Sequence, residues 1–154
     1  MKLTDALSPL LHMRRRDRIG GKRMKLDGFG ILVKDMAVMV RFYRDVLGFE
    51  IKEGEDAVNV LLEKDGTLFM LYRRADLETM TNTAFSYAEG INGHYEIALS
   101  VPCYAEVDKA FAAVMAAGAK PVLEPVTEPW GQRTCYVADP EGNLVEIGSF
   151  VKGD

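Results

Sequence analysis

Glu146 is the residue of this 154-residue chain whose setting most clearly indicates chemistry. It lies in an alternating segment in which Val145 and Ile147 share one face of a strand, and Glu146 shares the other face with Leu144 and Gly148. An unpaired buried charge is costly. Glu146 is therefore predicted to be solvated in a cleft, to have a partner, or to lie on an exposed edge of a sheet.

A second carboxylate lies in a similar segment. In residues 96–101 the apolar side chains occupy one face, and the other face carries a carboxylate and small residues, Glu96, Ala98 and Ser100. The first predicted strand of the chain carries Gly28 and Gly30 on the corresponding face. A face packed against a core would carry Val, Ile or Leu. The small residues therefore predict a cavity on the concave side of a curved sheet.

A turn precedes Glu146. Asp139-Pro140-Glu141-Gly142 combines an Asp, a Pro that presets φ and a Gly that tolerates positive φ, which predicts a tight turn between two strands. Lys64-Asp65-Gly66 stands at the matching place before Leu68 in the first half of the chain. The correspondence indicates that the chain contains two copies of one unit.

Hydrophobic periodicity predicts the same order of elements in both halves. In the first half, a helix capped by Asp35 lies between a strand and three further strands, at residues 28–33, 50–53, 58–62 and 67–72. In the second half, a helix at 107–115 lies among strands at residues 96–101, 120–124, 132–137 and 144–149.

These elements predict an α+β fold. We expect a single domain at residues 24–152, made of two βαβββ modules (about 25–74 and 94–151) that form a curved mixed sheet around a cavity. Residues 75–93 have no clear period and are predicted to be a connection, part of which packs down through Phe85 and Tyr87.

Residues 1–23 differ from the rest of the chain. They include Arg14-Arg15-Arg16-Asp17-Arg18 and have no apolar period, so they are expected to be disordered. They are either a basic tail for an acidic partner or a mis-assigned leader, with Met24 as the natural start.

Composition argues against several classes of partner. A net charge of -4 and a pI near 5.3 give no reason to expect nucleic acid or an anionic membrane. No apolar run approaches the roughly 20 residues that span a bilayer. Cys103 and Cys135 lack CxxC spacing, and no signal peptide is evident, which predicts free thiols and a cytoplasmic protein.

Other residues are candidates for the cavity wall. Met70 and Tyr72 share the concave face of the strand that closes the first module, and apolar walls with a few polar groups are typical of small-molecule pockets. Trp130 follows a Pro-rich loop, where it can stack on a planar ligand or pack as a plug. Tyr136 and Phe85 are further wall candidates.

The chain resembles the vicinal oxygen chelate superfamily, which includes glyoxalase I, extradiol dioxygenases, fosfomycin resistance proteins and bleomycin-binding resistance proteins. The resemblance rests on the paired modules, the helix at residues 40–49, Trp130-Gly131-Gln132-Arg133 and residues 139–147, and it covers nearly all of residues 25–150. It implies the paired-module fold and says less about the reaction.

Metal-dependent members of that superfamily hold their ion on the concave faces. Carried over by motif, the four ligand positions fall on Gly28, Met70, Glu96 and Glu146. Glycine offers no ligand and methionine only a soft thioether, so no cofactor is expected. A divalent metal remains an alternative, held by Glu96 and Glu146 with His94.

Neighbouring first and last strands, as the resemblance implies, would bring Glu96 and Glu146 close together. Like charges in a partly dry cavity raise the pKa of one carboxyl, so the pair would share a proton or attract a cation. Such a site suits a basic or hydroxyl-rich ligand. The structural alternative is that Arg133 or Lys120 neutralises a carboxylate.

Three functions remain open. The first is a metal-independent protein that sequesters a drug or metabolite in the concave cavity, with ligand contacts from Gly28, Gly30, Met70, Tyr72, Ala98, Trp130, Arg133 and Tyr136. The second is a glyoxalase-type lyase or isomerase with Glu146 as general base beside Glu96, or a dioxygenase. The third is an interaction module with a vestigial cavity. The resemblance and the open sheet edges also predict a homodimer.

Overall fold

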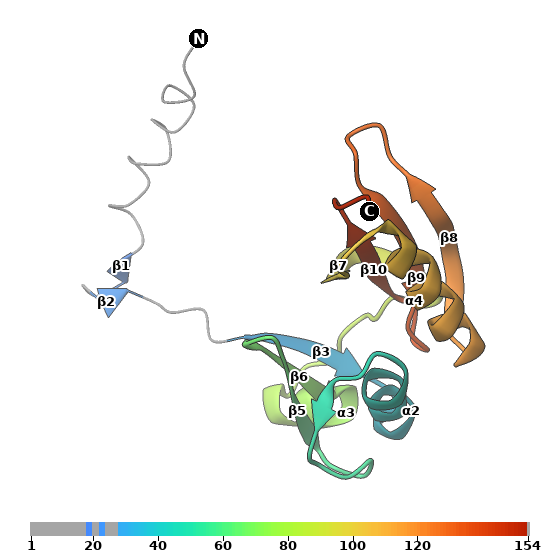
Figure 1. Ribbon diagram of the computed structural model, residues 1–154. Helices are drawn as coiled ribbons and strands as arrows, with labels where there is room; N and C mark the ends of the chain where they lie inside the picture. Colours follow the sequence, from blue (N-terminus) through green and yellow to red (C-terminus); the bar gives the residue numbers. More distant parts are fainter. Residues whose placement is uncertain (1–17, 20–21, 24–27, 154) are drawn as a thin grey trace.

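Each half of the chain folds into its own four-stranded mixed sheet with a helix against one face (Figure 1). The computed structural model describes residues 18–19, 22–23 and 28–153. Both halves follow the order strand, helix, strand, strand, strand. The predicted α+β class and the two βαβββ modules are confirmed, and neither sheet closes into a barrel.

The first module covers β3 to β6. Its strand order is β3-β6-β5-β4, and β3 runs parallel to β6. The elements are β3 (Phe29–Val33), α2 (Met36–Arg41), a π-helical turn η2 (Phe42–Val46), β4 (Glu50–Ile51), β5 (Asn59–Lys64) and β6 (Thr67–Arg73).

The first helix begins after Asp35, as the sequence predicts. The Asp35 side chain accepts a hydrogen bond from the Val38 N–H and so caps α2. The last turn widens, because the Leu47 N–H bonds the carbonyl of Phe42, five residues earlier. Gly48, at φ 70°, then ends the helix. The buried face packs on the sheet through Met39, Val40, Phe42 and Tyr43.

The second module repeats this arrangement with a longer helix. Its strand order is β7-β10-β9-β8, with β7 parallel to β10. The elements are β7 (Asn92–Ser100), α4 (Tyr104–Ala116), β8 (Lys120–Thr127), β9 (Arg133–Ala138) and β10 (Asn143–Ser149). Val107 and Val114 of the helix are buried with the sheet residues Cys135, Val137, Val145 and Ile147.

The segment between the modules differs from the prediction, because it contains a helix, α3 (Arg74–Thr81). No residue of α3 is buried, and its eight residues include only three apolar ones, Ala75, Leu77 and Met80, which are too few to establish a helical period. Of the two aromatic residues expected to pack down, Phe85 is 42% exposed, and Tyr87 lies 4.4 Å from the Arg74 guanidinium and contacts Phe85.

The expectation for residues 1–23 falls largely outside the described residues. Within that range, β1 (Arg18–Ile19) and β2 (Lys22–Arg23) form a short antiparallel pair. In the described part of the chain, no helix is long and apolar enough to cross a membrane.

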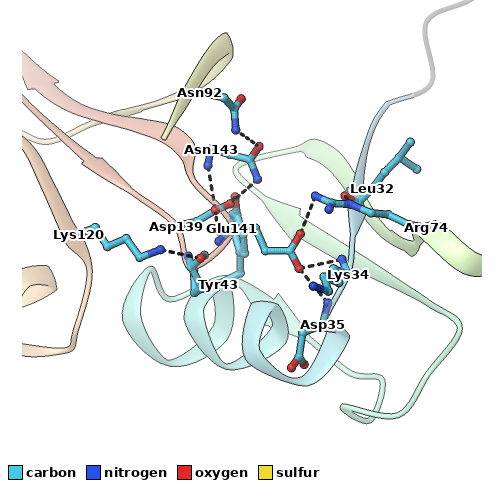
Figure 2. Close-up of polar contacts among 11 residues, drawn as sticks. Leu32, Lys34, Asp35, Tyr43, Arg74, Asn92, Lys120, Asp139, Glu141 and Asn143 are labelled. Atoms are coloured by element: carbon cyan, nitrogen blue, oxygen red, sulfur yellow. Dashed lines mark hydrogen bonds and ion pairs between the residues drawn. The ribbon is translucent and has the colours of Figure 1, made fainter. Parts of the chain in front are cut away.

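The Asp139 turn joins the two modules (Figure 2). One carboxylate oxygen of Glu141 accepts hydrogen bonds from the backbone N–H groups of Lys34 (2.7 Å) and Asp35 (2.8 Å), between β3 and α2. The other oxygen pairs with Arg74 at 2.8 Å. We call this group of contacts, together with the Tyr43–Asp139 bond described next, the inter-module joint.

Asp139 is the buried centre of the joint. Its carboxylate accepts from the backbone N–H groups of Glu141 and Asn143, at 2.9 and 3.0 Å, which forms the turn itself. It also accepts from the Tyr43 hydroxyl across the module boundary, at 3.1 Å. Burial, and then the neighbouring Asp139 charge, raise the pKa of Tyr43 well above its ordinary value, so this hydroxyl stays a donor.

Replacing Glu141 with Ala should loosen the joint. The substitution leaves two backbone N–H groups and Nη2 of Arg74 without their acceptor, while Arg74 Nε keeps its bond to the Leu32 carbonyl. Hydrogen bonds to charged groups contribute roughly 1.5–3 kcal/mol. We expect the free energy of unfolding in urea to fall by about 2 kcal/mol. The matched control is Glu89→Ala at an exposed position, which should change it by less than about 0.5 kcal/mol. Equal effects of the two substitutions would contradict the importance of the joint.

Candidate functional site

Glu96 and Glu146 lie on adjacent strands of the second module. β7 and β10 pair in parallel, with Leu144 opposite Glu96 and Glu146 opposite Ala98. The two carboxylates are thus offset by one pair on the same face of the sheet. Tyr136 of β9 lies opposite Glu146 on its other side. Three polar side chains from three neighbouring strands therefore share this face, which we call the acidic face.

Tyr136 shares the acidic face with both carboxylates. Burial raises the pKa of Tyr136 well above its ordinary value, and hydrogen bonding and charge from Glu96 and Glu146 raise it further. The phenol therefore stays neutral and supplies an O–H donor between two acids. The sequence predicted Tyr136 as a cavity-wall and ligand-contact residue and not as a donor beside the glutamates, although its spacing from Thr134 puts both on one face of β9.

Glu146 has two further donors on β9 and the loop before it. Its Oε1 accepts from the Gln132 side-chain amide at 2.9 Å and from the Thr134 hydroxyl at 2.8 Å. The Trp130 indole N–H donates to the Gln132 amide oxygen at 3.1 Å. Because an indole only donates, it fixes the Gln132 oxygen toward Trp130 and the NH₂ group toward Glu146. Glu146 is held as an acceptor by neutral groups.

Gly148 makes room for the Gln132 side chain. A Cβ at position 148 would lie 2.7 Å from Gln132 Nε2, too close for the amide to stay where it is. The sequence analysis did not identify Gln132, Thr134 or Gly148 as site residues. The sequence did contain a signal for them: Gly148 lies on the predicted strand that carries Glu146, and Gln132 and Thr134 lie on the predicted strand before it.

Two hollows border the acidic face. The larger, about 600 Å³, lies between the edge strands β3 and β7, and Gly30, Glu96 and Ala98 are among its lining residues. We call it the junction cleft. The smaller, about 450 Å³, lies over the end of β7 and is lined by Ala98, Ser100, Gln132, Glu146 and Gly148. Both volumes are within the range of small-molecule sites.

The other predicted ligand residues are spread over both modules. Met70 lies opposite Gly30 on β6, with its methyl group 3.8 Å from where a Gly30 Cβ would be. Tyr72 is half-buried opposite Leu32. Trp130 is 65% exposed in the loop between β8 and β9.

The two basic residues considered as partners of Glu146 have other contacts. Arg133 donates from Nε to Asp108 of α4 at 2.7 Å and from Nη1 to Thr127 at 3.1 Å. The Lys120 ammonium donates to the carbonyl of Pro140 at 2.8 Å. In the described structure, the donors that contact Glu146 are therefore neutral side chains.

The residues at the four metal-ligand positions do not fit a metal ion. A Cβ at Gly28 would lie 2.8 Å from the backbone oxygen of Leu68, so this backbone excludes a ligating side chain there. Met70 supplies only a thioether, and His94 is exposed at the start of β7. Within the described part of the chain, no three His, Cys, Asp or Glu side chains gather closely enough to hold one ion.

The fold and the acidic face define a protein of paired βαβββ modules with polar groups on an open sheet face. The model of the glyoxalase/bleomycin resistance protein/dioxygenase superfamily matches residues 25–147. The chain therefore belongs to that superfamily, as the resemblance in sequence indicated.

Solved structures agree with this assignment. A glyoxalase/bleomycin resistance protein/dioxygenase family enzyme from Burkholderia phytofirmans is 24% identical, with a TM-score of 0.71 over 83% of this chain and 100% of that chain. A protein of unknown function from Agrobacterium tumefaciens is 29% identical, with a TM-score of 0.65 over 82% and 94%. A lactoylglutathione lyase from the same organism is 22% identical, with a TM-score of 0.63 over 82% and 94%. No curated protein matches the sequence.

The two glycines of the first module's concave face should differ in their tolerance of a side chain. Gly28→Ala places a methyl group against the Leu68 carbonyl, so we expect a loss of roughly 1–3 kcal/mol in the free energy of unfolding. Gly30→Ala meets only the flexible end of Met70, at 3.8 Å, and should be neutral or slightly stabilising. Denaturant titration of both variants checks this difference. If Gly28→Ala leaves the free energy of unfolding unchanged, position 28 has room for a side chain, and the steric argument against a metal ligand there fails.

The pKa of Tyr136 should report the charges on the acidic face. Glu96 and Glu146 disfavour the phenolate, so replacing both by Gln should lower the pKa of Tyr136 toward its ordinary value, while burial keeps part of the shift. Absorbance of the phenolate during alkaline titration measures it, with Tyr136→Phe in each background identifying the signal. An unchanged titration in the double variant would mean that the glutamates are not near the hydroxyl.

Proposed function

We propose that this protein binds a small organic molecule on the acidic face of its second module, without a metal ion, and thereby sequesters it. The ligand carries an amine or hydroxyl donor that faces Glu96 and Glu146. The observation that carries the proposal is that Glu96, Glu146 and Tyr136 share one face of three neighbouring strands beside open hollows.

The hydrogen-bond pattern at Glu146 supports a donor-bearing ligand. Gln132 and Thr134 both donate to Oε1 of Glu146, and no cation contacts the carboxylate in the described structure. Neutral donors stabilise the carboxylate without cancelling its charge. A ligand ammonium would therefore find an uncompensated negative charge in a partly enclosed setting, where attraction is stronger than in bulk water.

The residues at the metal-ligand positions support binding without a metal. Gly28 has no room for a ligating side chain, and Met70 is a poor ligand for the hard and borderline metals that carboxylates favour. The remaining two carboxylates would bind a divalent ion weakly. Other functions of the superfamily that use an ion are for this reason less well supported.

A glyoxalase-type lyase is the second candidate. Tyr136 provides a neutral O–H donor close to Glu146, and an acid beside a base is what proton transfer next to a carbonyl requires. This candidate shares its residues with the binding function. Turnover of the hemithioacetal of methylglyoxal and glutathione distinguishes them.

A thermal-shift screen of amines, polyols and aromatic metabolites, with EDTA present, tests the proposed function. A true ligand should raise the melting temperature. Glu146→Gln should weaken ligand binding about tenfold or more, because hydrogen bonds to charged groups contribute roughly 1.5–3 kcal/mol. Tyr136→Phe should weaken it less. The control is Glu124→Gln, an exposed position on β8, which should bind as the unmodified protein does.

Two results would overturn the proposal. Ligand binding that depends on added Mn²⁺, Zn²⁺ or Ni²⁺ and is abolished by EDTA would restore a metal site. Hemithioacetal turnover that is lost in Glu146→Gln would favour the lyase.

A further inference from the structure

The junction cleft runs along the edges of two strands rather than over one face of a sheet. Successive residues of a strand point to opposite faces, yet the lining includes every residue from 95 to 100 of β7 and all of 29–31 of β3. β3 and β7 are each an outer strand of their own sheet, and within the described part of the chain no strand pairs with their outer edges. Backbone N–H and C=O groups along these edges are therefore available to an added strand.

The short hairpin before β3 directs a nearby segment toward its edge. β1 and β2 pair antiparallel, with Arg18 opposite Arg23 and Ile19 opposite Lys22. The two residues between them, Gly20-Gly21, are typical of a tight hairpin turn, which fixes the register of the strands it joins. Continued along the chain in this register, residues 10–13 would lie opposite residues 28–31, along the edge of β3 that borders the cleft.

The concave face of β3 has room for this segment. In the continued register, Leu11 lies opposite Gly30 and Met13 lies opposite Gly28, and directly opposite residues share one face of a sheet. A glycine on an edge strand leaves a gap that a larger side chain from a neighbouring strand can cover. Two apolar side chains would thus meet the two positions of β3 that have no side chain of their own.

The other face of β3 has apolar surface to cover. The same register places Leu10 opposite Ile31 and His12 opposite Phe29. Phe29 is 58% exposed, although a large apolar ring is normally buried. An added strand would cover the side of this ring and extend the apolar face that Ile31 begins.

Charge favours the same placement. Asp65 and Glu96 are on the cleft lining, and among the described residues that line it none is Lys, Arg or His. The segment is followed by Arg14-Arg15-Arg16, which the register places beside the start of β3, and Asp65 lies just before β6, the strand paired with β3. Residues 1–23 contain seven Lys and Arg and two Asp in a chain of net charge -4, so they are attracted to the acidic remainder.

We propose that residues 10–13 of this chain, which lie outside the described residues, add to the edge of β3 as an antiparallel strand and occupy the junction cleft. The β1–β2 hairpin is the turn that brings them there. This inference goes beyond the proposed function and is independent of it, because it requires neither a ligand nor Glu146. The same segment of a second copy is the competing occupant.

Disulfide trapping tests the register in the full chain. Directly opposite residues have Cβ atoms about 4.5–5.5 Å apart, so Leu11→Cys with Gly30→Cys should oxidise readily in a Cys103→Ser background, where the remaining Cys135 is buried. The control pairs Leu11→Cys with Phe29→Cys, which points to the other face and should link at least about tenfold more slowly. Equal rates overturn the inference. A product that joins two chains on a non-reducing gel also overturns it, because the occupant is then a second copy.

Hydrogen exchange tests the added strand without altering any described residue. Leu11→Pro removes a backbone donor from the proposed strand, so amides of residues 29–33 on the outer edge of β3 should exchange at least about tenfold faster than in the unmodified chain. Amides of β10 should not change. The control is Thr4→Pro, which lies outside residues 10–13 and should exchange as the unmodified chain does. Identical exchange of β3 in Leu11→Pro and the unmodified chain would overturn the inference, whether or not the Gly30→Cys variant folds.

Discussion

The arrangement of the two modules depends on the Glu141 carboxylate, which accepts from three donors beside the Asp139 turn. The backbone N–H groups between β3 and α2 have no partner in the helix that follows, and Glu141 from the other module supplies it. Arg74 donates to the second carboxylate oxygen of Glu141. Since β3 and β7 share no ladder, these contacts and the Tyr43–Asp139 bond determine how the two sheet edges face each other. The junction cleft exists because the joint holds the edges near each other without letting them pair.

The acidic face shows how a site with two carboxylates can be maintained without a cation. Gln132 and Thr134 donate to Glu146, and Tyr136 contributes a phenol that remains neutral because burial and both acids disfavour its ionisation. Each of these groups lowers the cost of an exposed negative charge, and none cancels it. The negative potential is thus available to a ligand, which is the property that the proposed function uses.

The sequence predicted the elements better than the contacts between them. The strands and the helix of each module follow from apolar alternation and periodicity, because burial on one face leaves a repeat in the chain. Helix α3 was missed because none of its residues is buried. The role of Glu141 was also missed: its partners Lys34 and Asp35 are 107 and 106 residues away, and no local pattern records such a contact. Gln132 was passed over because its partner is fixed by strand register rather than by its own neighbours.

The two corresponding turns have diverged in what they tolerate. Gly66 in the first module has no atom within 4 Å of where a Cβ would be, whereas a Cβ on Gly142 would lie 1.8 Å from the carbonyl oxygen of Gly90. Both glycines have a positive φ, which strains any side chain, but only at Gly142 does a Cβ also collide with backbone. The two halves are therefore not interchangeable: a chain made of two first halves would lack Glu141 and its contacts with Lys34, Asp35 and Arg74.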